Sequence, residues 1–407
     1  MRPGAVAALA IVCALVGGAA SLLIGRAAGW IDDGGTDTVF VRGGSEGSEG
    51  AVPVGRDAAR PLAGNEFDPA AIYEARADGV VTIAALFGSH AEGAGGAASQ
   101  GSGFVASADG YILTNSHVIT TAGEEAPGAV PEPASAVYVE FRDADRVPAQ
   151  IVGWDVFDDV GLLKVDPDDH PLEPVPLGDS SRVVVGEPVA AIGSPFGQMS
   201  SLSVGVVAGT ERSIASLTSE YDLVDAIQTD APINRGNSGG PMFDARGTVI
   251  GINAQIRSES GTAEGVGFAI PIDAAERSME QLIQTGRVRY AWIGVSMQSV
   301  TPSIAERFNL PIERGAAIQE VVPDSPGEKA GLRGGGEQET VAGARFRPGG
   351  DVVVSVNGRP IADAGDLVRA ITGRFLPGET IRLGILRGNE RLTVEAELAE
   401  RPATAPR

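Results

Sequence analysis

The chain is poor in the residues that build three common kinds of site. Its single cysteine, Cys13, excludes an intrachain disulfide. It has three histidines and no ligand-spaced group of Cys and His, so we expect no metal site. Lys and Arg number 31 against 53 Asp and Glu, and the net charge is −22. Phosphate contacts need clustered cations, so this balance argues against a nucleic-acid partner.

Nucleotide-binding signatures are equally scarce. No Walker-type loop is present. Residues 101–106 formally fit a Gly-rich dinucleotide fingerprint, but the residues after them predict a hairpin where that fold needs a helix. We therefore expect no cofactor.

The chain is rich in glycine, with 56 residues, and 43% of its residues are hydrophobic, with many Val and Ile runs. This composition favours a mostly β, turn-rich protein with real cores. At 407 residues the chain is longer than one ordinary domain.

The N-terminal region predicts a membrane anchor and a linker. Residues 4–25 carry no charge and have about the length that a helix needs to cross a bilayer. Arg2 precedes this span and acidic residues follow it, which places the N-terminus in the cytoplasm. We expect an uncleaved single-pass anchor over 1–29, with the rest of the chain extracytoplasmic. Gly, Ser, Asp and Glu dominate residues 30–66, which predicts a flexible linker.

A cleaved signal peptide is the alternative for the same segment. Gly18-Ala19-Ala20 is a suitable small-residue cleavage site. The long uncharged span favours the anchor, whereas cleavage would give a secreted protein. Both alternatives place the remainder of the chain outside the cytoplasm.

Three short motifs carry chemistry, in this chain order: 114–118 (Thr-Asn-Ser-His-Val), 159–163 (Asp-Val-Gly-Leu-Leu) and 236–241 (Gly-Asn-Ser-Gly-Gly-Pro). They supply His117 as a base, Asp159 as a carboxylate to orient it, and Ser238 as a nucleophile. The backbone amides of Gly236 and Ser238 could bind the oxyanion that forms on an attacked carbonyl. The sequence therefore predicts a nucleophilic triad in the order His, Asp, Ser.

Each motif taken alone has a plainer explanation. A histidine in an apolar context is often a core residue, and Asn-Ser-Gly-Gly can be an ordinary loop. The context decides between these explanations. Residues 101–105 and 110–113 predict a hairpin that leads to His117, and Val160 to Val165 predict a buried strand after Asp159.

From about residue 71 to residue 400 the chain resembles the HtrA family of trypsin-like serine proteases. The matching segments are 101–104, 114–118, 191–197, 234–241 and 265–271. The resemblance implies a chymotrypsin-like double β-barrel over residues 67–286, with His117, Asp159 and Ser238 as its triad. Asp158 is adjacent, but Asp159 holds the family's position before the apolar run. Gly161 and Pro232 stand where the family usually has alanine.

Residues 287–401 resemble the PDZ domain of the same family, an α+β module. The resemblance rests on residues 292–295, 321–326, 329–332 and 350–358. Such domains add a C-terminal peptide as a strand and hold its carboxylate on backbone amides. The carboxylate loop here would consist of Trp292, Ile293, Gly294 and Val295, with Arg287 or Arg289 assisting. Residues 334–348 form an insertion that could reshape the groove or extend into solvent.

The resemblance also implies a function. A membrane anchor, a protease domain and one PDZ domain are the layout of the DegS kind of stress-response protease. The substrates would be misfolded or regulatory proteins, cleaved after small aliphatic residues in a pocket of Ile233, Asn253 and Ala254. Aromatic residues near Phe67 would support a homotrimer, and C-terminal peptides would regulate activity through loops around 193–201, 210–222 and 255–264.

Two other functions remain open on the sequence alone. The chain could be a chaperone or peptide-binding adaptor in which proteolysis is secondary. A non-proteolytic esterase could use the same triad, although a PDZ domain does not favour it.

Overall fold

The computed structural model describes residues 67–88, 98–123, 130–194, 201–234, 236–254, 266–341 and 343–406. All of the described residues lie in one compact unit, Gly64–Arg407. The predicted anchor, residues 1–29, and linker, residues 30–66, lie outside the described residues. Among the described helices, none is long and apolar enough to cross a membrane.

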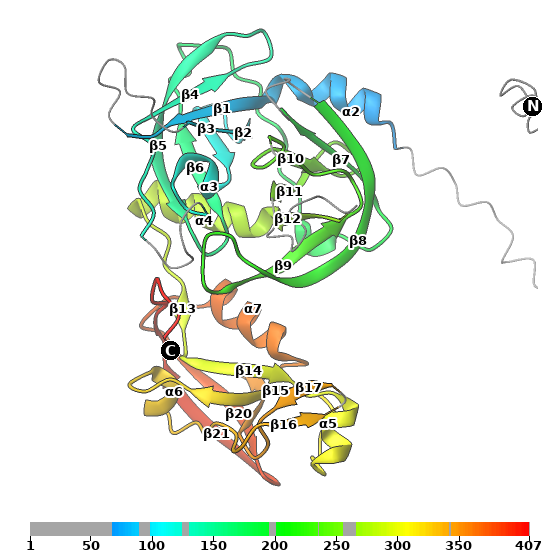
Figure 1. The fold of residues 1–407 in the computed structure, drawn as a ribbon, viewed down its shortest axis with the longest axis vertical. Coiled ribbons are helices and arrows are strands. Elements are labelled where there is room, and N and C mark those ends of the chain that lie inside the picture. The colour runs from blue at the N-terminus through cyan, green and yellow to red at the C-terminus, as the bar shows by residue number, and fades with distance from the viewer. Residues whose placement is uncertain are drawn as a thin grey trace, which may run out of the picture. The chain divides into compact units, whose positions relative to one another are not determined.

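Six antiparallel strands form a first closed barrel, in the order β1-β2-β3-β6-β5-β4 (Figure 1). Their bounds are β1 Val80–Leu86, β2 Ala98–Val105, β3 Tyr111–Thr114, β4 Ala136–Glu140, β5 Arg146–Asp155 and β6 Val160–Lys164. β2 and β3 form the predicted hairpin, with Phe104 opposite Leu113. The barrel interior is apolar, with Ile83, Ile112 and Leu163 fully buried.

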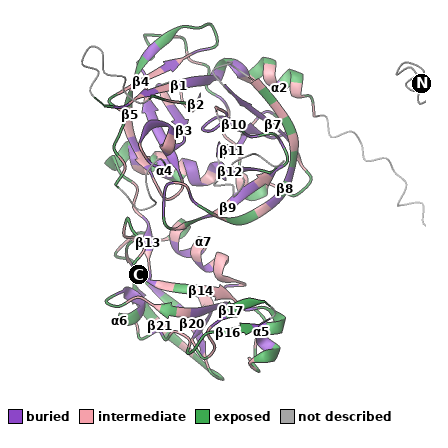
Figure 2. Ribbon diagram, in the orientation of Figure 1, coloured by how far each residue is buried: buried purple, intermediate pink, exposed green. Residues whose placement is uncertain are grey.

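A second closed barrel has the order β10-β11-β12-β9-β8-β7. Its strands are β7 Pro188–Gly193, β8 Ser201–Ala215, β9 Asp222–Thr229, β10 Pro241–Phe243, β11 Val249–Ala254 and β12 Gly267–Pro271. Every residue of β10, β11 and β12 is buried (Figure 2), and the three strands form the wall behind residues 236–240. The two barrels confirm the predicted double-barrel fold.

One apolar core joins the two barrels. It includes Phe104 and Leu162 from the first barrel and Ile192, Phe243 and Ile252 from the second. Helix α4, Ile272–Thr285, packs on this core through Leu282. The barrels are therefore fixed edge to edge, at the place where the His, Asp and Ser motifs meet. Four shorter helices complete this half: α2 Pro69–Arg76, η2 Ala77–Gly79, α3 Ser116–Ile119 and η3 Ser180–Arg182.

The C-terminal module contains an antiparallel sheet with the strand order β14-β15-β18-β20-β21, and helix α7 packs on β14, β15 and β18. Its strands are β13 Ala291–Trp292, β14 Val295–Ser299, β15 Ala316–Val321, β16 Glu339–Val341, β17 Ala344–Phe346, β18 Val352–Val356, β19 Arg359–Pro360, β20 Thr380–Arg387, β21 Glu390–Glu397 and β22 Ala399–Glu400. Its helices are α5 Pro302–Arg307, α6 Pro326–Lys329 and α7 Ala364–Arg374. Leu367 and Ile371 of α7 are buried in the module's core.

The inserted segment 334–348 forms a hairpin of β16 and β17. Phe346 stacks on Phe308 with ring centroids 5.3 Å apart. Phe346 also joins a small separate core with Val300 and Ile304. The insertion therefore packs against the region of α5.

A buried acidic cluster lies where the second module leaves the barrels. The hydroxyl of Tyr290, in the segment between α4 and β13, lies 2.6 Å from Asp155 Oδ2 and 2.7 Å from Asp158 Oδ2. Ser278 of α4 also donates to Asp155 Oδ2, at 2.7 Å. A phenol hydroxyl has one proton and donates one hydrogen bond, so the second close contact needs a proton on a carboxyl group. Burial, followed by the charge of Asp158, raises the pKa of Asp155 to about 6.

This cluster predicts that stability falls as pH rises from about 4 to about 6. A carboxyl whose pKa is raised on folding binds more protons folded than unfolded in that window, so unfolding becomes easier as the proton leaves. A rise of the Asp155 pKa from 3.8 to about 6 corresponds to roughly 3 kcal/mol. The measurement is the urea midpoint between pH 4 and 7.5 for a protein beginning at Gly64. Asp155→Asn should flatten the curve in this window, and an unchanged curve would contradict the argument.

Candidate active site

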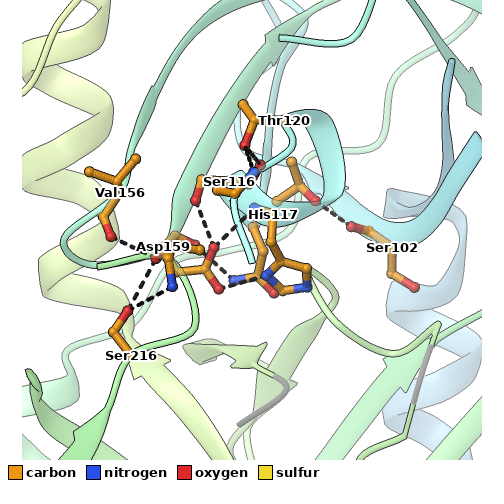
Figure 3. Close-up of polar contacts among 11 residues, drawn as sticks. Ser102, Ser116, His117, Thr120, Val156, Asp159 and Ser216 are labelled. Carbon is orange, nitrogen blue, oxygen red and sulfur yellow. Dashed lines mark hydrogen bonds and ion pairs between the residues drawn. The ribbon is translucent and has the colours of Figure 1, made fainter. Parts of the chain in front are cut away.

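His117 and Asp159 lie on neighbouring segments of the first barrel and face each other (Figure 3). His117 follows β3 in the short helix α3, and Asp159 directly precedes β6, which pairs with β3. The Nδ1 atom of His117 lies 2.7 Å from Asp159 Oδ2. Asp159 takes a left-handed conformation, with φ of 52°, at the start of its strand. Pairing of β3 with β6 therefore brings the predicted base and carboxylate into contact.

The carboxylate of Asp159 is buried and held by further donors. Its Oδ1 atom accepts a hydrogen bond from the Ser116 hydroxyl at 2.7 Å and from the His117 backbone N–H at 3.1 Å. The side chain of Asn115 donates to the Asp159 backbone carbonyl at 2.9 Å. The sequence reasoning missed Asn115 and Ser116, although both stand in the motif around His117. The two donors to Oδ1 fix the direction of the carboxylate.

Electrostatics at His117 favour the charged ring. Burial lowers the pKa of the imidazole, but the charge of Asp159 and the hydrogen bond to it raise that pKa by more. The net result is a pKa above the usual 6.5. The imidazolium that forms when His117 accepts a proton is therefore stabilised by Asp159.

Ser238 lies on a buried turn of the second barrel, between β9 and β10. The turn is fixed at both sides, because Gly239 N–H donates to the Asn253 carbonyl at 2.9 Å and Ser102 N–H donates to the Ser238 carbonyl at 2.8 Å. A Cβ on Gly239 would lie 2.2 Å from the Ser102 carbonyl oxygen, so only glycine fits there. Among the described residues, the Ser238 hydroxyl has no hydrogen-bond partner. In unliganded enzymes, the hydrogen bond between a nucleophilic serine and its base commonly forms only when substrate binds.

The predicted oxyanion donors belong to this same turn. Gly236 has φ of +99°, a conformation that side chains rarely adopt. Its carbonyl oxygen accepts hydrogen bonds from the Ser102 hydroxyl at 2.5 Å and from Ser194 N–H at 3.3 Å. The sequence reasoning gave Ser102 no role.

The residues predicted for the specificity pocket lie on adjacent segments behind the turn. Ile233 is buried against Gly267, and Asn253 and Ala254 end β11. Asn253 is fully buried, its backbone pairs with Gly239 and Gly240, and its side chain donates to the Pro241 carbonyl at 3.2 Å. Asn253 therefore supports the nucleophile turn. Of the loops predicted to move, residues 195–200 of the loop 193–201 and all of 255–264 lie outside the described residues, whereas 210–222 are described.

A pocket of about 490 Å³ contains the predicted carboxylate loop. Trp292, Ile293, Gly294 and Val295 line it, together with Val368 and Ile371 of α7. Its lining also includes barrel residues: Ser213, Tyr221, Asp222 and Val224. Arg289 pairs with Glu400 at 2.9 Å, and Arg287 lies 3.9 Å from the same carboxylate. Arg401 is the basic residue that lines the pocket.

His170, the other histidine among the described residues, makes contacts that indicate a structural role. Its ring stacks on Phe141 with centroids 3.8 Å apart, and its Nε2 atom lies 3.2 Å from Asp143. Within the described ranges, no group of three or more His, Cys, Asp or Glu side chains could hold a metal ion. His90 lies outside those ranges.

Comparison with known proteins matches two families. A trypsin-like peptidase domain matches residues 101–252, and a PDZ domain matches residues 291–398. A probable periplasmic serine endoprotease, DegP-like, from Hahella chejuensis is 41% identical over 307 residues, which are 75% of this chain and 58% of that protein. A DegP-like relative from Pseudomonas putida (strain W619) is 40% identical over 306 residues. The chain thus spans less than two thirds of the length of these relatives.

Solved structures match over nearly their whole length. The HtrA-type protease AlgW with a tripeptide is 32% identical, with a TM-score of 0.65, and the match covers 82% of this chain and 98% of that one. A serine endoprotease from Yersinia pestis is 28% identical, with a TM-score of 0.56, over 82% of this chain and 98% of that one. The chain belongs to the HtrA-type family of trypsin-like serine endoproteases.

Proposed function

We propose that this chain hydrolyses peptide bonds of other proteins through Ser238, His117 and Asp159. The observation that carries the proposal is the 2.7 Å contact between His117 Nδ1 and the buried Asp159 carboxylate, on the barrel that faces the Ser238 turn. This contact fixes the tautomer that leaves Nε2 free to accept the Ser238 proton. A serine hydroxyl becomes an effective nucleophile only beside such a base.

The reaction would proceed in two transfers. Ser238 Oγ attacks the substrate carbonyl carbon while its proton passes to His117, and the resulting oxyanion accepts hydrogen bonds from the amides of Gly236 and Ser238. His117 then gives the proton to the leaving amine, which departs and leaves an acyl group on Ser238. Water, deprotonated by His117, hydrolyses this ester and restores the serine. Ile233, Asn253 and Ala254 would favour a small aliphatic residue before the cleaved bond.

The groove beside Trp292–Val295 supports peptide regulation. A C-terminal peptide there would add a strand to β14 and place its carboxylate near the amides of the loop. The same pocket is lined by Tyr221 and Asp222 of the barrel, so an occupant would contact both modules. Such contacts could bias the loops that shape the Gly236 amide. The related HtrA-type protease AlgW has been solved with a tripeptide, which supports peptide binding here.

The cellular setting follows from the relatives and the sequence. The DegP-like relatives are named periplasmic, which favours an extracytoplasmic location for the barrels and groove. The uncharged residues 4–25 would tether them to the membrane. Leu202, Val204 and Val206 expose a row of apolar side chains on β8, which is compatible with association into a homotrimer. The substrates would be misfolded or regulatory proteins, cleaved under stress.

Cleavage that depends on Ser238 tests the proposed activity. A protein beginning at Gly64 should degrade an unfolded model protein, and Ser238→Ala should lower kcat by about 10⁶-fold, because no nucleophile remains. Product fragments identified by mass spectrometry provide the measurement. If neither protein cleaves, even when groove peptides are added, a chaperone or adaptor function explains the chain better. Suppression of aggregation by Ser238→Ala would support that function.

The pH dependence tests the role of His117. We expect kcat/KM to rise with pH through an apparent pKa above 6.5, because His117 must be neutral to accept a proton and Asp159 raises its pKa. Asp159→Asn should lower kcat by about 10⁴-fold and move the apparent pKa down. A profile that keeps its midpoint in the variant would contradict this assignment.

Peptide titration tests regulation. Peptides ending in apolar residues should bind and raise kcat/KM several-fold, up to about a hundredfold. Val368→Arg, which blocks the groove wall, should abolish both binding and activation while it leaves basal cleavage unchanged. Demonstrated binding without any change in turnover would exclude this form of regulation.

A further inference from the structure

Ser102, in β2, is a fully buried residue whose polar groups hold several parts of the site. Its backbone N–H donates to the Ser238 carbonyl at 2.8 Å. Its backbone carbonyl accepts a hydrogen bond from the Thr114 hydroxyl at 2.6 Å. Thr114 is the last residue of β3, three residues before His117. The backbone of Ser102 thus links the nucleophile turn to the strand that carries the base.

The side chain of Ser102 makes a second set of contacts. Its hydroxyl donates to the Gly236 carbonyl at 2.5 Å and accepts from Ser194 N–H at 2.8 Å. Ser194 in turn accepts a hydrogen bond from the Thr82 hydroxyl at 2.6 Å through its own Oγ atom. Thr82 and Ser102 belong to the first barrel, whereas Ser194 and Gly236 belong to the second. The hydroxyl of Ser102 is therefore the link between the first barrel and the Gly236 peptide.

Gly236 needs an external restraint of this kind. Glycine adopts positive and negative φ about equally well, so the residue itself does not hold φ at +99°. The Gly236 N–H lies in the peptide plane before the Gly236 Cα and the carbonyl in the plane after it, so the direction of the N–H depends on φ and ψ of Gly236 and on the plane of its carbonyl. A hydrogen bond to the Gly236 carbonyl fixes that plane, and the bond from Ser102 N–H to the Ser238 carbonyl fixes the far side of the turn.

We propose that Ser102 is a positioning residue for the oxyanion site, whose hydroxyl holds the Gly236 peptide so that the Gly236 amide points at the developing oxyanion. The role rests on the proposed protease function and extends it. Ser102 does not touch the substrate. It acts through the Gly236 peptide, so its removal should affect the transition state more than the bound ground state.

The test compares Ser102→Ala with wild type on a small peptide substrate. The variant keeps both backbone hydrogen bonds and loses only the hydroxyl. We expect kcat to fall by about tenfold to a hundredfold, somewhat less than on loss of an oxyanion donor, while KM changes little. The apparent pKa of His117 in the pH profile should stay at its wild-type value, because Ser102 contacts neither His117 nor Asp159.

A peptide trifluoromethyl ketone provides a measurement that would not change if the Ser102 hydroxyl had only a structural role. The inhibitor forms a hemiketal with Ser238, and its hydroxyl ionises in the oxyanion site. ¹⁹F NMR of this adduct should show a higher hemiketal pKa in Ser102→Ala, because the oxyanion is less well stabilised. Inhibitor affinity should fall in proportion to kcat/KM, whereas affinity for a product peptide should not change.

Thr229→Val is the matched control. The buried Thr229 hydroxyl also donates to a carbonyl, that of Val206 at 2.8 Å, and accepts an N–H, that of Ala231 at 3.0 Å, within the second barrel. This control should lose similar stability and keep its kcat and hemiketal pKa. If Ser102→Ala does not fold, Ser102→Cys, which keeps a weak donor, replaces it and should show the same changes in smaller measure.

The outcomes separate two failures. Wild-type kcat and hemiketal pKa in a folded Ser102 variant would overturn the positioning role and leave the proposed function intact. Equal kcat losses in Ser102→Ala and Thr229→Val would also overturn it, because destabilisation alone would then explain the effect. Absence of Ser238-dependent cleavage in wild type would contradict the proposed function instead.

Discussion

The site depends on one set of buried hydrogen bonds between the two barrels. The shared apolar core brings the barrels together, but apolar attraction is not directional and does not set their register. Three hydrogen bonds of Ser102 supply that direction. Its N–H donates to the Ser238 carbonyl, and its hydroxyl donates to the Gly236 carbonyl and accepts from Ser194 N–H. Ser102, Ser194 and Ser238 are buried, where an unmade hydrogen bond costs about 1–3 kcal/mol, and Gly236 is half-buried. A sliding of one barrel on the other would break several of these hydrogen bonds together.

Two adjacent aspartates make contacts in different places, one in the candidate active site and the other at the junction with the second module. Asp159, with φ of 52°, directs its carboxylate at His117 and Ser116. Asp158 directs its carboxylate at Tyr290, two residues before Trp292 of the peptide groove. Arg401, which lines that groove, lies 5.3 Å from the centroid of the Tyr290 ring. One backbone segment is thus in contact with His117, the proposed base, and with Tyr290 beside the groove.

Much of this arrangement could be predicted from the sequence. The three motifs and the strand patterns around them carried the family resemblance that predicted both barrels, and the family's position for the aspartate favoured Asp159 over Asp158 as the partner of His117. Short motifs predict structure well here because the residues of each local segment follow one dominant pattern. The domain boundaries at 67–286 and 287–401, the specificity pocket and the membrane anchor stay predictions.

Other features depend on contacts between distant segments. Ser102 is 134 residues away from Gly236, and nothing in its own neighbourhood reveals that its hydroxyl reaches that carbonyl. The same is true of Arg401, which lines the groove, whereas the sequence suggested Arg287 or Arg289 as the assisting residue. The insertion 334–348 has few strong apolar residues, and Phe346 finds its partner Phe308 only in the folded module. A spacing pattern cannot show such pairings.

The account makes one central claim, that Ser238 is a nucleophile activated by His117. The most direct measurement is intact-protein and peptide mass spectrometry after reaction with a peptide phosphonate that has a small aliphatic residue at the reactive position. A single adduct on the Ser238 peptide is predicted, formed faster as His117 deprotonates and nearly abolished by His117→Ala. An adduct elsewhere, or labelling of Ser238 at the same rate without His117, would contradict the account.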